Sequence, residues 1–231
     1  MKRLIVAVLL LTAALTCRAA EVGSLRCEYL ADPLGIDATR PRLSWVVSSS
    51  LRGDRQTAYR VLVASSPELL ACGEGDLWDS GKTASGRSIQ VEYGGKPLAG
   101  LAKCYWKVRV WDADDRPSRW SEPARWSMAL LDDSDWQAGW IGIDSALNAT
   151  DRMEGDSRLA ARYLRKPFDV EGKVKNARLY ISGLGLYECY INGKRVGESV
   201  LAPTATDYST NVPYNTFDVR EFIKDKQNAI G

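Results

Sequence analysis

Hydrophobic and polar side chains alternate in short runs along most of this chain, and turn-forming residues separate the runs. The clearest runs are residues 43–47, 59–63 and 106–110, which each mark one strand face by period-two spacing. Clusters such as SGKTASGRS and DADDRPS lie between runs of this kind. No helical periodicity persists over a dozen residues after residue 20. The pattern over residues 25–130 therefore predicts an all-β sandwich.

The alternation resumes after residue 160 and includes the clearest hairpin of the chain. Residues 187–191 lead into Asn192-Gly193, a dipeptide that two-residue turns with positive φ angles prefer. Pro167 cannot donate a hydrogen bond to a neighbouring strand, so it predicts an edge strand or a bulge. Asp218 precedes VREFI, where we expect a short helical turn with the aspartate as its cap.

The start of the chain has the pattern of a secretory signal. Lys2 and Arg3 precede an apolar run, and Ala19 matches the small residue before a cleavage point. We therefore predict a signal peptide over residues 1–19 and a secreted or periplasmic mature chain without a membrane anchor. Lipidation of Cys17 fits less well, because the residues beside it are unusual next to a lipidated cysteine.

Charge and composition exclude several classes of function. Cleavage after Ala19 would change the formal net charge from +2 to −1. A nearly neutral chain argues against nucleic acid and anionic membranes as partners, because both attract clustered positive charge. Histidine is absent, so the commonest general base and the commonest zinc ligand are missing. The serines consequently have no histidine to activate them as nucleophiles.

Metal chemistry has little support in the sequence. Four cysteines follow the predicted signal peptide, without a Cys-x-x-Cys pair: Cys27, Cys72, Cys104 and Cys189. They fit either buried free thiols or disulfides of an oxidising compartment. Aspartates cluster at residues 112–115 and 132–135, where calcium could bind weakly, but neither cluster has EF-hand spacing. We therefore predict solvated acidic turns and no metal site.

All eight tryptophans lie between Trp45 and Trp140. Trp45 and Trp106 fall on predicted inner strand faces, which assigns them to the core. Three others lie close to an arginine in the sequence: Trp111, Trp120 and Trp126. Aromatic faces can stack on sugar rings, but this neighbourhood favours cation–π stacking along an exposed sheet face.

Residues 131–158 have no sustained strand pattern, and we interpret them as a junction or linker. An acidic turn comes first. Trp136, Trp140 and Ile141 follow it and are expected to pack into a short apolar cluster.

The segment RCEYLADPLGIDATRPRLSW, residues 26–45, is similar to the start of bacterial α-L-rhamnosidases. Its middle, ADPLGID, has the character of an ordered turn for which local propensity gives no simple reason. Residues 40–130 resemble a fibronectin type III domain, with PRLSW and YRVLVA as its second and third strands. Domains of this type usually have a conserved tyrosine at the corner before the sixth strand. Here Trp106 occupies the inward-facing position expected for that tyrosine, so we expect Tyr105 to face away from the core.

Residues 159–231 resemble the galactose-binding-like jelly-roll domain of rhamnosidases and other large glycosidases. The resemblance rests on ARYLRK, YECYINGKRVG, LAPTATDY and YNTFDV. A jelly roll has about eight strands, and we count five at most, so we expect an incomplete domain. The expected fold class is therefore all-β, a fibronectin-III/Ig-like sandwich followed by an incomplete galactose-binding-like jelly roll.

The resemblance also implies where catalysis takes place. In that family two carboxylates of a helical (α/α) barrel hydrolyse terminal α-L-rhamnosyl residues with inversion. The barrel would lie beyond residue 231, so no residue of this chain is expected to be catalytic. The implied partners are a rhamnose-containing glycan or glycoside and the downstream barrel of the same polypeptide. No organic cofactor is implied, although a structural calcium ion could accompany a complete jelly roll.

Sugar binding is the one activity that residues 159–231 could carry alone, because jelly-roll domains bind glycans at their loop ends. The candidates are Asp207 and Tyr208 in the irregular loop after Pro203, and Asn192 at the hairpin tip. For Asn192 the needs of a tight turn are a sufficient alternative explanation.

Two other functions stay open at this point. A non-catalytic carbohydrate-binding protein predicts measurable sugar affinity. A surface-adhesion module predicts protein partners, no sugar affinity and an exposed apolar patch.

Overall fold

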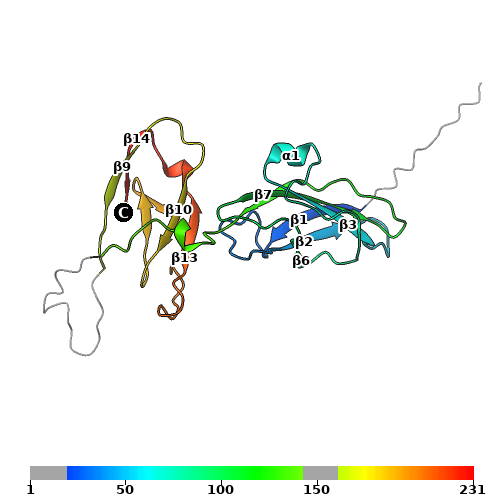
Figure 1. The fold of residues 1–231 in the computed structure, drawn as a ribbon, viewed down its shortest axis with the longest axis horizontal. Helices are drawn as coiled ribbons and strands as arrows, with labels where there is room; N and C mark the ends of the chain where they lie inside the picture. Colours follow the sequence, from blue (N-terminus) through cyan, green and yellow to red (C-terminus); the bar gives the residue numbers. More distant parts are fainter. Residues whose placement is uncertain (1–19, 143–160) are drawn as a thin grey trace, which may run out of the picture. The chain divides into compact units, whose positions relative to one another are not determined.

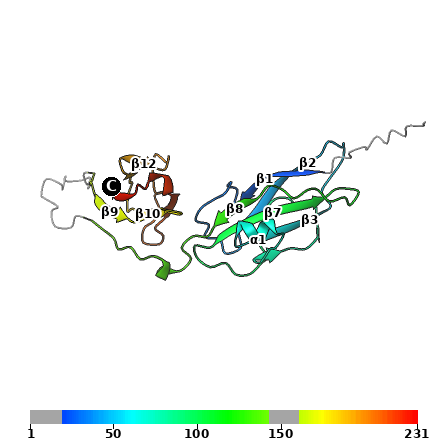
Figure 2. The ribbon, with the colours of Figure 1, turned by 90° about the horizontal axis from the view of Figure 1, so that it is seen from above.

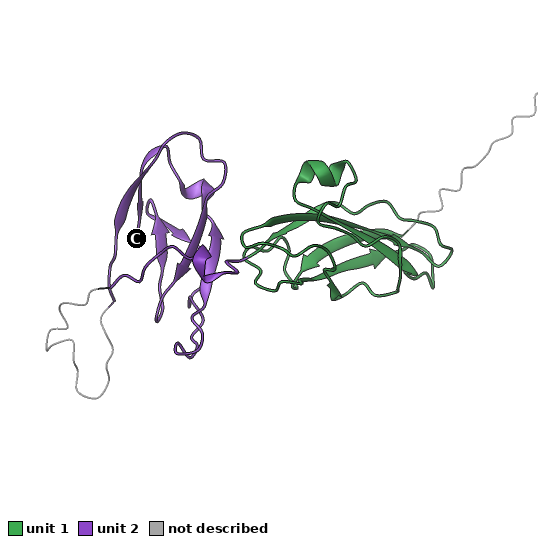
Figure 3. Cartoon of the chain, viewed as in Figure 1, with its two compact units in different colours: residues 1–128 green, residues 129–231 purple. Residues whose placement is uncertain are grey.

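A computed structural model describes residues 20–142 and 161–231 of the chain. The chain divides into two compact units, Met1–Met128 and Ala129–Gly231 (Figure 3). The predicted signal peptide and residues 143–158 of the predicted junction lie outside the described residues. Within the described ranges, no helix has the length and apolar character needed to cross a membrane.

The first unit is an antiparallel β-sandwich of two sheets (Figures 1 and 2). The first sheet has the order β1-β2-β6 and comprises β1 (Glu21–Cys27), β2 (Arg42–Ser48) and β6 (Val91–Glu92). The second sheet has the order β4-β3-β7-β8, with β5 also paired to β3. Its strands are β3 (Ala58–Ala64), β4 (Trp78–Asp79), β5 (Thr83–Ala84), β7 (Lys103–Trp111) and β8 (Ala124–Ser127). This architecture confirms the predicted all-β sandwich.

The core of the sandwich forms between the two sheets. Its fully buried side chains include Leu43, Trp45, Val61, Val63, Trp106 and Val108. The assignment of Trp45 and Trp106 to the core is therefore confirmed. The indole N–H of Trp45 donates to Oε1 of Gln56 at 2.9 Å, and the Gln56 amide donates to the carbonyl oxygens of Ser85 and Arg87. Each polar group of this buried pair thus has a partner, as buried polar groups need.

The opening segment, residues 26–45, is ordered, as predicted, and long-range hydrogen bonds hold it. The Glu28 carboxylate accepts hydrogen bonds from the backbone N–H and from Nη2 of Arg42, both at 2.6 Å. Further along, the N–H of Ile36 donates to the carbonyl of Ser127 in β8 at 2.9 Å, and the Ile36 side chain is buried. These contacts with distant residues explain an ordered turn that local propensity does not.

The outer face of β3 and β7 is covered by the helix α1 (Pro67–Ala71), which lies over these strands in Figure 2. Leu69 and Leu70 of α1 pack there with Leu62, Ala64, Tyr105 and Trp120. Tyr105 therefore faces away from the sandwich core, as the phase of Trp106 predicts. The Ser66 hydroxyl accepts a hydrogen bond from the N–H of Leu69, and Pro67 occupies the start of the helix, which together fix its first turn.

Cation–π contacts are present at Trp111 and Trp120, as predicted, although the cation over Trp111 is Lys82 and not an arginine close in sequence. The same prediction was wrong for Trp126, which is buried and packs edge-to-face against Tyr93 at a ring-centroid distance of 6.1 Å. The register explains the difference. Trp126 of β8 pairs with Cys104 of β7, an inward-facing buried residue, so its indole also points into the core.

The second unit is also built from antiparallel strands, in two sheets. β10 (Arg178–Ser182) pairs with β13 (Tyr214–Asp218). The other sheet has the order β12-β11-β14-β9 and comprises β9 (Lys166–Val170), β11 (Cys189–Ile191), β12 (Lys194–Val196) and β14 (Lys226–Ile230). The described residues of this unit thus contain one strand more than the sequence count. Pro167 lies on β9, at the edge of this sheet, which confirms its predicted position.

The core of the second unit forms around Cys189, Ile191, Val196 and Val219, with half-buried side chains such as Leu179, Phe217 and Phe222 packed against them. The predicted helical turn is present as a 3-10 helix, Arg220–Phe222, but its N-cap is Val219 and not Asp218 as predicted; Oδ1 of Asp218 accepts a hydrogen bond from the N–H of Arg220. All four cysteines of the described ranges are free thiols, of which Cys72 is exposed. Burial raises the pKa of the Cys189 thiol, which therefore stays protonated in the core.

The described part of the junction begins with a 3-10 turn, Asp133–Asp135, in which the side chain of Asp132 caps the N-terminus. Trp136 then packs against Tyr214 at a ring-centroid distance of 5.7 Å. Trp140 and Ile141 are 66% and 77% exposed. The predicted apolar cluster of these three residues is therefore wrong, because only Trp136 meets a partner in the β10–β13 sheet.

The Glu28–Arg42 contact predicts a specific pH dependence of stability. Hydrogen bonds from Arg42 hold the pKa of Glu28 below its ordinary value of 4.5. The carboxylate therefore stabilises the fold above about pH 4.5 and loses this contribution as the pH falls through the lowered pKa. We expect Glu28→Gln to reduce the free energy of unfolding by about 1 kcal/mol near neutral pH. The same change should have little effect near pH 2. Urea denaturation followed by tryptophan fluorescence measures both values.

The matched control is Glu122→Gln, which neutralises an exposed carboxylate of the same unit. It should leave the free energy of unfolding nearly unchanged at both pH values. An equal loss for Glu28→Gln at neutral and acidic pH would contradict a stabilising ion pair.

Candidate functional site

Two loops of the second unit are joined by hydrogen bonds and carry two of the predicted sugar contacts. They are residues 183–188, between β10 and β11, and residues 197–213, between β12 and β13 (the orange segment in Figure 1). The N–H of Tyr187 donates to the carbonyl of Ala202 at 2.7 Å. The hydroxyl of Tyr208 accepts a hydrogen bond from the N–H of Gly185 at 3.0 Å. We call these two connected loops the loop end.

Asp207 organises the tip of the longer loop. Its Oδ1 accepts hydrogen bonds from the N–H and the hydroxyl of Ser209, at 3.0 and 2.6 Å. Its backbone carbonyl accepts from the N–H groups of Thr210 and Asn211, both at 2.9 Å. The bonds from Ser209 hold the pKa of Asp207 below its usual range, so the side chain is ionised at neutral pH. Oδ2 has a single long contact of 3.4 Å with the Thr210 hydroxyl and retains acceptor capacity.

Tyr208 follows in the same loop and is 36% exposed. The loop end also exposes apolar side chains, all more than 60% accessible: Leu184, Leu186, Val200 and Leu201. An aromatic ring beside a carboxylate suits a pyranose, because the ring can pack on C–H groups while the carboxylate accepts hydroxyl hydrogen bonds. The loop end therefore has the chemistry of a sugar contact.

Asn192 lies elsewhere in the unit. It follows the end of β11, whereas the loop that contacts Tyr208 precedes the start of that strand, so the two lie at opposite ends of β11. The Asn192 amide N–H groups donate to the carbonyl of Phe222 and to Oδ1 of Asn228, both at 2.8 Å. Its Oδ1 accepts from the N–H of Ala229 at 3.0 Å. Asp207 and Tyr208 thus lie next to each other in one loop, and Asn192 lies at the other end of β11.

The backbone of Asn192-Gly193 forms the predicted turn, with φ angles of 52° and 78°. Left-handed angles of this kind favour asparagine and glycine. Together with the three side-chain hydrogen bonds, they give Asn192 a structural role that accounts fully for its presence.

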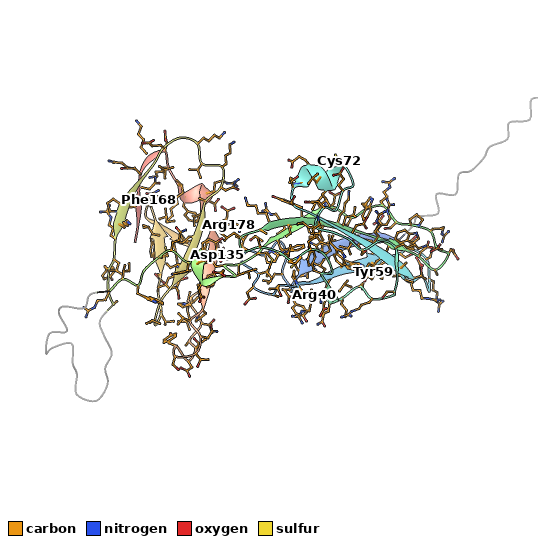
Figure 4. All side chains as sticks on the ribbon, in the orientation of Figure 1. Arg40, Tyr59, Cys72, Asp135, Phe168 and Arg178 are labelled. Carbon is orange, nitrogen blue, oxygen red and sulfur yellow. The ribbon has the colours of Figure 1, made fainter. Side chains whose placement is uncertain are left out.

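A shallow groove of about 400 Å³ lies beside this turn. It is lined by Arg165, Pro167, Phe168, Asp169, Asn192, Gln227, Asn228 and Ala229, and Phe168 is labelled on β9 in Figure 4. Arg165, Asp169 and Gln227 are exposed and supply hydrogen-bonding groups of both kinds. Sequence reasoning missed this groove, because its walls come from β9 and β14, which are far apart in the sequence and meet through strand pairing such as that of Gln227 with Asp169.

The two aspartate clusters are stabilised by hydrogen bonds of their own. Asp112 is buried and accepts hydrogen bonds from the backbone N–H groups of Asp114 and Arg116 and from the Arg116 side chain, each at 2.9 Å. Asp132 accepts from the N–H of Ser134 at 2.8 Å. In the ranges that the structure covers, no group of three or more His, Cys, Asp or Glu side chains is arranged to hold a metal ion.

Comparison with protein-family models gives two matches, in sequence order. Residues 22–132 match the N-terminal immunoglobulin domain of Rha78A-like proteins, and residues 172–231 match the N-terminal domain of α-L-rhamnosidases. Among curated proteins, an α-L-rhamnosidase of Formosa agariphila is 38% identical over 204 residues, which is 88% of this chain and 22% of that protein. The chain therefore spans about a fifth of the length of such relatives.

Solved structures give the same picture. An α-L-rhamnosidase from Dictyoglumus thermophilum has a TM-score of 0.80 and 37% identity, covering 91% of this chain and 24% of that one. An α-L-rhamnosidase of Streptomyces avermitilis, solved in complex with L-rhamnose, has a TM-score of 0.54 and 33% identity, covering 92% of this chain and 21% of that one.

Substitution of Asn192 tests its structural role. Asn192→Ala removes three hydrogen bonds and disfavours the left-handed turn, and the half-buried carbonyl of Phe222 and N–H of Ala229 lose this partner. We expect it to lower the free energy of unfolding of the second unit by about 2 kcal/mol. Asn192→Gly should cost less, because glycine retains the turn conformation. Hydrogen exchange at the amides of β11 and β14 measures both effects. The exposed Lys194→Ala on β12 is the control, and an equally small loss for Asn192→Ala would refute the structural role.

Proposed function

The chain belongs to the α-L-rhamnosidase family, in which it corresponds to the N-terminal region, and on this premise we propose that it is the accessory region of a secreted enzyme that hydrolyses terminal α-L-rhamnosyl residues. The observation that carries the proposal is the pair of family matches in the order immunoglobulin domain, then rhamnosidase N-terminal domain. The structure in complex with L-rhamnose supports a rhamnose-containing glycan as the substrate class. The predicted signal peptide over residues 1–19 supports secretion.

In this proposal the chemistry belongs to a downstream (α/α) barrel of the same polypeptide. Inversion needs one carboxylic acid to protonate the leaving oxygen and one carboxylate to activate a water molecule on the opposite face of the sugar. The two groups stand roughly 6.5–9.5 Å apart. The acidic groups described above serve other purposes, since Asp112 and Asp132 stabilise turns and Glu28 pairs with Arg42.

The second unit would contribute a sugar contact at the loop end. Asp207 is held ionised with acceptor capacity, and Tyr208 presents an aromatic ring beside it. A carbohydrate-binding module without catalysis is the alternative function, and the loop end is the observation that favours it. The two differ in whether the full-length protein cleaves a rhamnoside.

The proposed activity is tested on the full-length gene product. We expect it to hydrolyse an aryl α-L-rhamnoside and to release β-L-rhamnose first, which proton NMR of the anomeric signal detects before mutarotation. The 231-residue chain alone should release no rhamnose. An aryl β-glucoside serves as the control substrate. Release of the α-anomer would contradict the inverting mechanism, and failure to cleave any rhamnoside would leave the binding module as the function.

The sugar contact is tested separately in the chain itself. We expect Tyr208→Ala to weaken binding of a rhamnose-containing oligosaccharide by about fivefold, the value of one aromatic contact of about 1 kcal/mol. Isothermal titration calorimetry measures the affinity. Tyr190→Ala, which removes a similarly exposed tyrosine on β11, should leave it unchanged. Equal losses for both variants, or no affinity in the unmodified chain, would remove the loop end as a sugar site.

A further inference from the structure

Three cationic side chains converge on one indole ring on the outer face of the sandwich. The guanidinium carbon of Arg109 lies 4.6 Å from the ring centre of Trp120, Nζ of Lys107 lies 5.1 Å away, and the guanidinium carbon of Arg60 lies 6.0 Å away. All three residues stand on β3 and β7, the strands that α1 partly covers (Figure 2). We call Arg60, Lys107, Arg109 and Trp120 the cationic face.

The strand register makes this arrangement costly. Arg60 of β3 lies directly opposite Arg109 of β7, and Lys107 is two positions from Arg109 on the same side of the strand. Like charges directly opposite one another in a sheet are destabilising. Lys107 is also nearly buried, at 9% exposure, and burial together with the charge of Arg109 lowers its pKa. Trp120 offsets part of this cost, because the negative face of its ring attracts the cations.

The protein supplies only part of the negative charge that these cations need. Asp79 forms a two-point ion pair with Arg60, from Nε at 2.9 Å and from Nη2 at 2.6 Å. Nζ of Lys107 donates to the carbonyl of Leu70 at the end of α1, at 2.6 Å. In the described part of the chain Arg109 has no hydrogen bond and no ion pair, and its Nε is buried without an acceptor. In the described ranges the ion pairs of these three cations therefore involve one carboxylate, that of Asp79, which pairs with Arg60.

We propose that the cationic face is an oxoanion site, in which Arg109 and the neighbouring Arg60 bind a sulfate or carboxylate group of an acidic polysaccharide. An oxoanion fits because a guanidinium can present two parallel N–H donors to two oxygens, and the guanidinium carbon of Arg109 lies close to the Trp120 ring. An anion there also relieves the repulsion between the cross-strand arginines. That the anion is carried by a polysaccharide rests on the proposed function, whereas the oxoanion site itself rests only on the charges described here.

Binding to defined polyanions tests the inference. The probes are dextran sulfate, polygalacturonate, inorganic sulfate and neutral dextran, with affinity measured by calorimetry at low ionic strength. We expect the chain to bind at least one polyanion, and neutral dextran not at all. Arg109→Gln should weaken this binding by about tenfold, the equivalent of one charge-assisted hydrogen-bonded contact. The affinity of Arg109→Lys should lie between that of the unmodified chain and that of Arg109→Gln, since lysine retains the charge and loses the two-donor geometry.

The matched control is Arg52→Gln, which removes one positive charge from an exposed loop of the same unit. It should leave the affinity within about twofold of the unmodified chain, because Arg52 is not part of the cationic face. Equal weakening by Arg52→Gln and Arg109→Gln would overturn the site in favour of general attraction. Absence of binding to every polyanion would overturn it as well. Near-UV circular dichroism establishes whether the variants are folded. If Arg109→Gln does not fold, Arg109→Lys still tests the site.

The choice of probe identifies the source of the anion. Preference for dextran sulfate assigns a sulfate ester, preference for polygalacturonate assigns a carboxylate, and binding of inorganic sulfate alone would overturn the polysaccharide part of the proposal. None of these measurements uses rhamnose. A failed rhamnosidase assay would therefore leave the oxoanion site intact, and a failed polyanion assay would leave the proposed enzyme intact.

Discussion

The pairing of β3 with β7 is the contact on which the first unit depends. Each of the seven residues of β3 has a partner on β7; one face of this pair lies in the sandwich core, and α1 covers part of the other. Because side chains alternate along a strand, one face must suit the sandwich core while the other suits α1 and a row of cations. Val61 and Val63 accordingly lie in the core, and Arg60 lies outside. A slip by one residue would exchange these environments, so both faces together fix the register.

The parts of the fold that follow from local spacing or from the chemistry of one residue could be predicted from the sequence. Trp45 and Trp106 were identified as core residues from period-two spacing, Pro167 as an edge residue from its missing N–H, and Asn192-Gly193 as a turn from its φ preference. Trp126 could not be placed, because its direction depends on which residue of β7 it faces. The same limit applies to the groove beside β9, whose walls meet only through strand pairing.

The candidate site, too, could be predicted from the sequence only in part. Residue type and loop position selected Asp207, Tyr208 and Asn192 together, and the structure places the first two in the loop end and Asn192 away from it. No sequence signal indicates that the Asn192 amide is occupied by Phe222, Asn228 and Ala229, since these partners lie 30 or more positions away. Of the cationic face, the sequence indicated only Trp120 and Arg109, as members of a set of tryptophans close to arginines. The sequence could not reveal that one indole collects three cations from two strands.

The hydrogen bonds between the opening segment and β8 have a consequence for biosynthesis. Asp32, Pro33 and Ile36 exchange hydrogen bonds with Arg125 and Ser127, almost at the end of the first unit. About ninety more residues must therefore be synthesised after the opening segment before its hydrogen-bonding partners exist. Synthesis proceeds at roughly 5–20 residues per second. If the chain is exported, its first residues arrive without their final contacts. The strands β1 and β2 can pair with each other before then, so it is β8 that completes the hydrogen bonds of the opening segment.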